Sequence, residues 1–439
     1  MAGAYDALIV GAGAAGLAAL RELDRAGLNV LCVEARGRVG GRIFTQRDPL
    51  SPIPIELGAE FIHGRPPEIW DIVRAAHLPV YDVTDRVVHV ENGRIVSHSD
   101  AWLIAGKINE EMRQAAERGP DQTFAEFLTK SHQPEGSKRL AANFIEGFNA
   151  ARKEMVGIAS LAKDMQASDQ IDGDRSFRFL SGYEAVTGHL LRGVREPQSA
   201  VRLNTIVEAV HWREGSATVQ VRPAFTGMVK SIAARRVIVT APLGVLQHGD
   251  IGFSPEPGET LAAVRQLAFG QVVRIILRFR ENVWEDNDSL ADAGFLLSDN
   301  PVFPAWWTPL AVRAPLITGW SAGPHADALL NQPADFVLAR ALESLARILG
   351  RTKDELASQV EAFYFHDWHA DPFARGAYSY VPAGAASARE RLATPVANTL
   401  FFAGEATETQ GHSATVHGAI ASGRRAAKQI LSEKEEERG

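Results

Sequence analysis

The chain has 439 residues, 46% of them hydrophobic, and a formal net charge of -7. This length predicts two or three domains and a core large enough to fold without metal or disulfide support. The negative charge argues against a nucleic-acid partner, because phosphate backbones attract basic surfaces, and it is compatible with a cationic ligand. The single cysteine, Cys32, excludes an internal disulfide and fits a reducing compartment.

Neither end of the sequence shows a targeting or anchoring pattern. Residues 1–6 lack the charged and apolar segments of a signal peptide. The apolar run 7–20 is interrupted by glycines and is shorter than the roughly 20 residues that a membrane-spanning helix needs. The charged residues 433–439 favour a solvated tail. We therefore expect a cytoplasmic protein without a membrane partner.

The first predicted unit is a strand, a glycine turn, a helix and a second strand. Residues 7–10 and 30–33 are continuous apolar runs, which are typical of strands in a parallel sheet covered on both faces. Residues 17–25 have the composition of a helix, and Gly27 follows at a position where helices end. The turn between them, 11–16, matches the pattern G-x-G-x-x-G.

Each glycine of this turn has a physical role in binding a dinucleotide. Gly11 permits the tight turn, Gly13 lets the backbone approach a diphosphate, and Gly16 lets the helix pack on the strand. Unpaired N–H groups at the helix start, around Ala15, attract phosphate. Glu34 follows at close to the expected distance of about 20 residues, where an acid binds ribose hydroxyls. The pattern by itself does not choose between NAD and FAD.

Further along the chain, helical and strand-like segments alternate in blocks. Residues 66–194 predict mainly helices, among them 101–116 and 137–151. The remaining predicted elements are strands within 201–221 and at 236–240, 272–279 and 400–402, and helices at 334–349, 353–360 and 416–431. This order predicts nucleotide-binding pieces at both ends and in the middle of the chain.

Five blocks in a fixed order carry a resemblance to a known family. The first joins the glycine turn to Glu34-Ala35-Arg36-Gly37-Arg38-Val39-Gly40-Gly41-Arg42. Its paired glycines permit close backbone approach, and Arg36 and Arg42 can donate to a diphosphate. The other blocks are 56–64, 237–246, 376–380 and 402–419. Together they resemble the flavin-containing amine oxidases, which include monoamine, polyamine and amino-acid oxidases and the lysine-specific histone demethylases.

The resemblance implies a mixed α/β (α+β) fold, in which a Rossmann-type FAD-binding domain is interleaved with a substrate-binding domain of sheet plus helices. We place the FAD-binding domain at 1–85, 200–255 and 370–439, and the substrate-binding domain at 86–199 and 256–369. The residues that the resemblance places at the cofactor are Gly11, Gly13, Ala15, Gly16, Glu34, Ala35, Arg36, Gly41, Arg42, Gly58, Ala59, Glu60, Phe61, Val207, Trp368, Gly404, Glu405, Thr415 and Val416.

Two of these predicted contacts explain how the flavin itself is held. The resemblance implies that Glu405 meets the ribityl hydroxyls and that a helix starting near Thr415 and Val416 points its positive end at the flavin. Ala377 stands where monoamine oxidases carry the cysteine that attaches to the flavin. We therefore predict that FAD is bound without a covalent link.

The implied reaction removes a hydride equivalent from the carbon next to an amine nitrogen, and dioxygen then yields hydrogen peroxide. The amine reacts in its neutral form, so activity should rise with pH. Tyr378 matches one tyrosine of the monoamine oxidase cage, whereas Thr415 replaces the other and implies a wider pocket, as in polyamine oxidases. His63 matches a histidine of animal polyamine oxidases and either contacts substrate or is structural. Trp306 and Trp307 either line the pocket or fill the core.

Arg274 stands where the family typically has a lysine that holds a water against the flavin. An arginine stays charged and cannot act as a base. We therefore hypothesise that Arg274 keeps the water but slows reoxidation, which would make the protein partly a dehydrogenase. The histidines and aspartates of 366–371 fit no trusted zinc spacing, and no metal is predicted.

The favoured substrate is a polyamine-like or N-alkylated primary or secondary amine, with dioxygen as the electron acceptor. An L-amino-acid oxidase remains open, because Arg274 or Arg313 could hold a carboxylate. A carotenoid or porphyrinogen oxidase, an amine dehydrogenase and a flavin-bound interaction protein are further alternatives. The sequence does not determine the oligomeric state.

Overall fold

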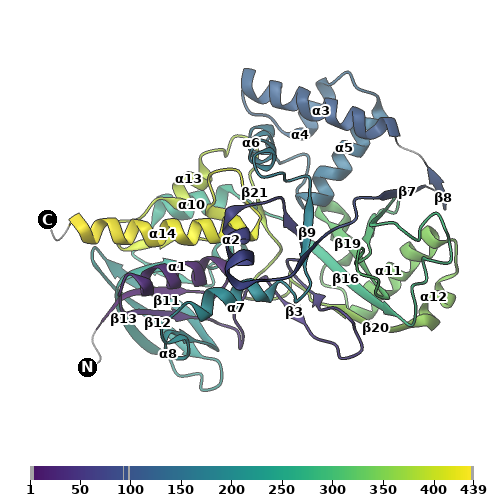
Figure 1. Cartoon of the computed structure of the whole chain (residues 1–439). Helices are drawn as coiled ribbons and strands as arrows, with labels where there is room; N and C mark the ends of the chain where they lie inside the picture. Colours follow the sequence, from purple (N-terminus) through teal and green to yellow (C-terminus); the bar gives the residue numbers. More distant parts are fainter. Residues whose placement is uncertain (1–3, 92, 97–98, 437–439) are drawn as a thin grey trace.

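The computed structural model describes residues 4–91, 93–96 and 99–436. Figure 1 shows one large sheet with long helices at the left, a second large sheet at the right, and a group of helices above them. Within the described part of the chain, no helix is both long enough and apolar enough to cross a membrane. The cytoplasmic location stays a prediction.

The first large sheet combines both ends of the chain with its middle. Its strand order is β10-β2-β1-β13-β12-β11-β14, with β22 also paired to β13. Strands β1, β2, β13 and β22 are parallel, whereas β11, β12 and β13 are antiparallel neighbours. The bounds are β1 Tyr5–Val10, β2 Val30–Val33, β10 Val201–Arg202, β11 Thr205–Arg213, β12 Ser216–Pro223, β13 Lys230–Val239, β14 Gly252–Ser254 and β22 Leu400–Phe402.

Helices cover both faces of this sheet. Along β1, Ala7 and Ile9 belong to a core cluster with the helices on one side, and Leu8 and Val10 to a second cluster on the other side. The first side is covered by α1 (Ala14–Arg25), α14 (Val416–Glu436), α7 (Glu184–Arg192) and α2 (Pro67–Ala76), and the second by α9 (Leu243–His248), α10 (Gly258–Gln266) and α13 (Ala388–Ala393). Double coverage explains why the parallel strands are continuously apolar.

The second large sheet has the order β20-β16-β19-β18-β17-β7-β8. Its bounds are β7 Val87–Glu91, β8 Arg94–Val96, β16 Val272–Phe279, β17 Phe295–Ser298, β18 Ala305–Trp307, β19 Leu316–Ala322 and β20 Val360–Phe365. The 3-10 segment η1 (Gly323–Leu329), α11 (Ala334–Leu349) and α12 (Lys353–Gln359) pack on it. All eight residues of β16 are buried, including two arginines, Arg274 and Arg278.

Smaller elements connect the two sheets. Three short strands, β5 (Ile62–His63), β9 (Ser176–Phe179) and β6 (Val80–Asp82), form a small sheet in that order. The helical group contains α3 (Ser99–Arg118), α4 (Phe124–Lys130), α5 (Glu135–Phe148) and α6 (Ile158–Asp169). The other short elements are β3 (Thr45–Gln46), β4 (Ile55–Glu56), α8 (Pro197–Ala200), β15 (Ala268–Phe269), β21 (Ser379–Tyr380) and η2 (Glu405–Thr407).

Most predicted elements are confirmed, and the fold class is the predicted one. The strands at 30–33, 272–279 and 400–402 and the helix at 334–349 have the predicted bounds. The mainly helical character of 66–194 is confirmed by α2 to α7, although four short strands, β6 to β9, also lie there. Strand β7 pairs with β17, and a partner so distant in sequence leaves no local pattern. The domain limits remain a prediction, while the first sheet draws its strands from 5–33, 201–254 and 400–402.

Candidate active site

One cavity of about 1740 Å³ is lined by residues of all five sequence blocks. This volume exceeds the roughly 300–1,000 Å³ typical of a site for one small ligand, so a dinucleotide and a second molecule fit together. Every residue predicted at the cofactor or in the chemistry lines it, with the exception of Gly16. Their individual roles stay predictions.

The glycine turn forms one end of this cavity and presents bare backbone to it. Helix α1 begins after Gly13, which supplies no side-chain cap, and the first-turn N–H groups of a helix have no acceptor within the helix. Gly11 has a φ of +99°. A Cβ on Gly16 would lie 1.9 Å from the carbonyl oxygen of Gly11, whereas a Cβ on Gly13 would meet nothing closer than 4.0 Å. The turn therefore fits a diphosphate, and Gly16 serves packing.

The acid of the fingerprint is held in place by two backbone donors. The N–H of Ala12 donates to Oε2 of Glu34 at 2.8 Å, and the N–H of Arg36 donates to Oε1 at 2.9 Å. The guanidinium of Arg36 pairs with Asp371 at 2.8 Å, and His366 Nε2 lies 2.8 Å from the same carboxylate. These residues of 366–371 thus anchor Arg36, and the described residues contain no group of three potential metal ligands.

At the other end of the predicted cofactor path lies Glu405. Its Oε2 accepts from Ser379 Oγ at 2.7 Å and from the N–H of Ala414 at 3.2 Å, while Arg42 pairs with Oε1 at 3.0 Å. Burial by itself would raise the pKa of Glu405, but Arg42 and Arg389 hold that pKa below its usual value. Glu405 is thus a buried carboxylate with several donors already in place.

Helix α14 begins at the cavity wall. The hydroxyl of Thr415 accepts from the N–H of Gly418 at 3.0 Å and so caps the helix, and Thr415, Val416 and His417 all line the cavity. His417 is 4% exposed, and its Nε2 has no hydrogen-bond partner among the described residues. Burial lowers the pKa of His417 to about 3, so the imidazole is neutral. The sequence prediction missed His417, although it lies inside a quoted block.

The predicted substrate wall is tied to the end of helix α5. The hydroxyl of Tyr378 donates to the carbonyl oxygen of Phe148 at 2.6 Å, and Nε1 of Trp320 donates to that of Gly147 at 2.9 Å. His63 lies beside this point, with its ring centroid 5.5 Å from that of Phe148 and its Nδ1 3.3 Å from Ser176 Oγ. Burial lowers the pKa of His63 to about 4, which leaves a neutral imidazole facing the cavity.

The structure distinguishes Trp307 from Trp306, which the sequence placed either in the pocket or in the core. Trp307 and Trp368 line the cavity, whereas Trp306 is fully buried in the core and donates to Ser344 Oγ at 3.2 Å. Nε1 of Trp368 donates to the carbonyl oxygen of Leu57 at 2.8 Å. Trp307 instead donates to Glu60, a residue predicted at the cofactor, at 3.0 Å.

The two arginines considered as carboxylate partners differ in position. Arg274 lines the cavity, but it pairs with Glu60 and donates to the carbonyl oxygen of Gly58 at 2.7 Å. Arg313 pairs with Glu285 at 2.6 Å on an exposed surface and does not line the cavity. The suggestion that Arg313 holds a substrate carboxylate was therefore wrong.

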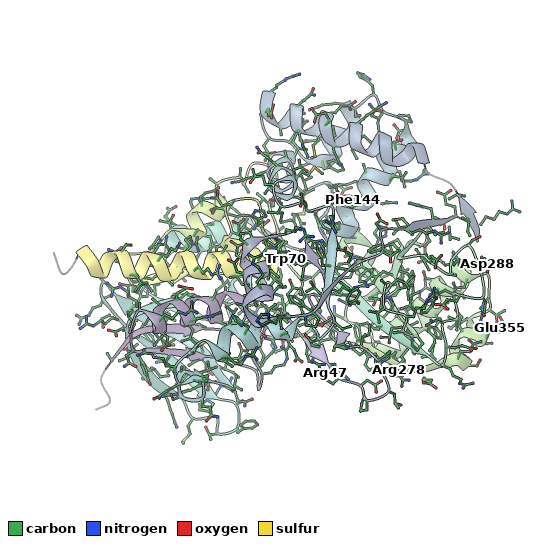
Figure 2. The ribbon with its side chains drawn as sticks, in the orientation of Figure 1. Arg47, Trp70, Phe144, Arg278, Asp288 and Glu355 are labelled. Atoms are coloured by element: carbon green, nitrogen blue, oxygen red, sulfur yellow. The ribbon has the colours of Figure 1, made fainter. Side chains whose placement is uncertain are left out.

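One part of the cavity lining is apolar and another part is acidic. Leu140, Phe144 and Phe148 line the cavity at four-residue spacing along α5, and the rings of Phe144 and Phe148 stack at 5.3 Å while remaining 45% and 51% exposed. Figure 2 labels Phe144. Asp85 and Asp299 line it from the strand side, where β7 pairs with β17. Neither aspartate pairs with a cation among the described residues.

Comparisons with known proteins agree with the predicted resemblance. The sequence model of the family described as flavin containing amine oxidoreductase matches residues 14–431. The Lysine-specific histone demethylase 1 homolog 3 of Arabidopsis thaliana is 28% identical over 97% of this chain. The human Peroxisomal N(1)-acetyl-spermine/spermidine oxidase is 27% identical over 97% of this chain and 94% of its own length. The chain spans 30% to 58% of the length of the plant demethylase homologues that head these matches.

Solved structures agree in fold. A putrescine oxidase, whose structure is described as wild type bound to putrescine, superposes with a TM-score of 0.82 at 22% identity, covering 98% of this chain and 99% of that one. The Cyclohexylamine Oxidase from Brevibacterium oxydans IH-35A gives 0.81 at 20% identity, covering 99% and 100%. Both confirm the predicted mixed α/β fold.

Proposed function

Since this chain belongs to the flavin containing amine oxidoreductases, we propose that it oxidises an amine carrying a second cationic group, such as a diamine or polyamine, and passes the electrons to dioxygen. Membership makes the protein an FAD-dependent enzyme acting on CH–NH or CH–NH2 donors. The polyamine preference, the release of hydrogen peroxide and the residue roles are the proposal.

The observation that carries the proposal is the difference in charge between two parts of the cavity lining. Asp85, Asp174 and Asp299 are exposed carboxylates that line the cavity, the described residues provide no cation paired with them, and they outnumber the exposed Arg139 of the same lining. His63 and His417, which are buried, are neutral. An acidic entrance attracts a distal ammonium group, whereas an uncharged interior favours a neutral reacting nitrogen.

The apolar wall supports the same substrate class. The exposed rings of Phe144 and Phe148 offer a flat surface to the hydrocarbon segment between two nitrogens, and such rings also attract cations. The name of the human relative refers to N(1)-acetyl-spermine and spermidine, and that of the structural neighbour to putrescine. Both are compatible with a substrate that combines methylene chains with several nitrogens.

The proposed reaction begins with a neutral amine. The bond between hydrogen and the carbon next to nitrogen breaks, the hydrogen leaves with the electron pair, and the nitrogen lone pair forms a C=N bond. Bound FAD supplies the two-electron acceptor that the side chains lack. Water then converts the imine into an aldehyde and a released amine, and dioxygen takes up two electrons and two protons to give hydrogen peroxide.

The chain's own residues bind and orient the amine and exclude water. Tyr378, fixed by Phe148, forms one wall, while His63 can accept a hydrogen bond from the substrate nitrogen without competing for its proton. Thr415 opens the opposite wall. Because the amine must be neutral, kcat/KM should rise with pH until the amine is deprotonated.

Non-covalent binding of FAD follows from the cysteine position. Cys32 is the only cysteine; it is fully buried in β2, and its Sγ approaches the carbonyl oxygen of Gly11 at 3.5 Å. It therefore lies behind the glycine turn and offers no thiol to the flavin. Denaturation should release all the flavin into solution.

Slow reoxidation remains part of the proposal. Two N–H donors of Arg274 are engaged by Glu60 and Gly58, and the planar guanidinium fixes the direction of the remaining donors, so it would hold a water in a different geometry from a lysine. To test this, wild type and Arg274→Lys are reduced under nitrogen and mixed with oxygen. Equal reoxidation rates would refute the idea.

The decisive experiment is an anaerobic titration of the yellow protein with a diamine, a polyamine, a monoamine and a set of L-amino acids. We expect bleaching of the flavin by the diamine and polyamine at the lowest concentrations, and peroxide on admission of air. Bleaching by amino acids alone would favour the L-amino-acid oxidase, and bleaching without peroxide the dehydrogenase. No bleaching by any of them would favour the interaction protein.

A further inference from the structure

A buried cluster of charges lies at the wall of the cavity. The carboxylate of Glu60 lies between two guanidinium groups: Nε of Arg178 is 2.7 Å from Oε1, and Nη2 of Arg274 pairs with Oε2. The three side chains are only 11%, 4% and 5% exposed, respectively. Two buried cations thus share one carboxylate.

Neutral donors, acceptors and rings also contact the cluster. Trp307 donates to Glu60 Oε2 at 3.0 Å, and its ring lies 5.5 Å from the guanidinium carbon of Arg274. Arg178 donates to the carbonyl oxygen of Thr308 at 2.9 Å and lies 4.7 Å above the ring of Phe61. The cluster of two guanidinium groups and one carboxylate carries one positive charge in excess.

Arg178 influences the site only through Glu60. Arg274, Glu60 and Phe61 line the cavity, but Arg178 does not, so it cannot touch a molecule bound there. It belongs to β9, which pairs with the strand β5 that carries His63. The ion pair of Arg178 with Oε1 of Glu60 leaves Oε2 to Arg274, so Arg178 determines which oxygen of Glu60 faces Arg274.

We propose that Arg178 is a positioning residue: acting through Glu60, it holds the guanidinium of Arg274 in one orientation at the cavity wall and keeps the net charge of the cluster positive. The inference rests on the proposed function in that it assumes an enzyme-bound flavin beside Arg274. A positive charge at that wall favours uptake of electrons and their transfer to dioxygen, since both steps build negative charge.

The test compares Arg178→Met with Arg178→Lys in the flavin-loaded protein. Arg175→Met is the matched control, because Arg175 also pairs with a carboxylate, Asp82, and covers the ring of Phe177, but is exposed. Each protein is reduced by light under nitrogen without an amine. Reoxidation by oxygen is then followed, and the reduced fraction is measured against a redox dye.

We expect Arg178→Met to reoxidise about tenfold more slowly than wild type and to be harder to reduce against the dye, because the cluster loses one unit of charge. Arg178→Lys restores the charge, so its equilibrium with the dye should return to within about twofold of that of wild type. It does not restore the planar guanidinium, so its reoxidation should stay about threefold slower than that of wild type. Arg175→Met should match wild type in both measurements. Glu60→Gln should shift the dye equilibrium in the opposite direction to Arg178→Met.

Two results would overturn the inference. One is an Arg178→Met protein that reoxidises within twofold of Arg175→Met; the other is an Arg178→Lys protein as impaired in both measurements as Arg178→Met, which would indicate a structural role alone. If the methionine variant does not fold, a lysine variant equal to wild type in reoxidation rate also overturns it. Because light reduces the flavin, failure of the proposed amine class leaves this test intact.

Discussion

The two ends of the cavity are built in different ways. The end around Gly13 and Gly41 consists of backbone that stands open because side chains are missing. The substrate end consists of side chains from distant segments, such as Tyr378, Phe148 and Arg274, which fix one another through hydrogen bonds and ion pairs. A site built from backbone loses ligand binding when a side chain is added to it. A site built from side chains changes its affinity or rate gradually as the charge or shape of those side chains changes.

The largest effect should come from adding a side chain at the glycine turn. In Gly16→Val, the new Cβ would lie 1.9 Å from the carbonyl oxygen of Gly11, which no rotamer relieves. We expect loss of most bound flavin and a loss of stability of about 3 kcal/mol or more. Flavin absorbance and urea denaturation measure both. Gly136→Ala is the control, since a Cβ there meets nothing within 4 Å; full flavin content in Gly16→Val would contradict the packing argument.

A pH-dependent effect is expected beneath the substrate end, at Glu56. Its Oε1 accepts from the N–H of Tyr183 at 2.7 Å and its Oε2 from Thr45 Oγ1 at 2.9 Å, yet burial raises its pKa to about 7 from the usual 4.5. Between these two values the folded state holds a proton that the unfolded chain lacks, so this carboxyl lowers stability as the pH rises through the window.

Glu56→Gln removes this pH-dependent loss of stability, because glutamine does not ionise. We expect the variant to gain about 2 kcal/mol relative to wild type at pH 8 and far less at pH 5, measured by urea denaturation of the holoprotein. The exposed Glu184→Gln serves as the control. An equal difference from wild type at both pH values would show that Glu56 is ionised throughout.

Removing the apolar wall should weaken substrate binding without affecting the glycine end. In Phe148→Ala the carbonyl that accepts from Tyr378 is kept, and only the exposed ring is lost. We expect KM for a long diamine to rise about fivefold, with flavin content and kcat little changed. Phe225→Ala is the control, because Phe225 is 85% exposed in the loop between β12 and β13. An unchanged KM would remove α5 from the substrate path.

The smallest effect is expected at the acidic entrance. Asp85→Asn and Asp299→Asn should each raise KM for a diamine about two- to threefold at low salt, leave a monoamine unaffected, and lose their effect as salt screens the charge. Asp288→Asn is the matched control, because Asp288 is exposed and does not line the cavity; it is labelled at the right of the molecule in Figure 2. A salt-independent change, or one equal for the monoamine, would contradict steering by charge.

The amino-acid sequence by itself determined the glycine turn, the strands around it, the family and the cofactor. Glu34 and Gly16 act within the local unit they belong to, so their spacing alone carries the information. Through the family resemblance it also predicted Arg274, Tyr378 and Thr415 as residues of one site, and all three line the same cavity.

Only the tertiary structure decided what those residues touch. Arg178 and Glu60 meet Arg274 because β9 and β16 are brought together, and the end of α5 holds Tyr378 although nothing near either residue in the chain indicates the contact. It also removed Arg313 from the site and revealed His417 as a buried imidazole without a partner. Sterics that act within a few residues leave a pattern in the sequence, whereas pairing between distant segments depends on the packing of the whole chain.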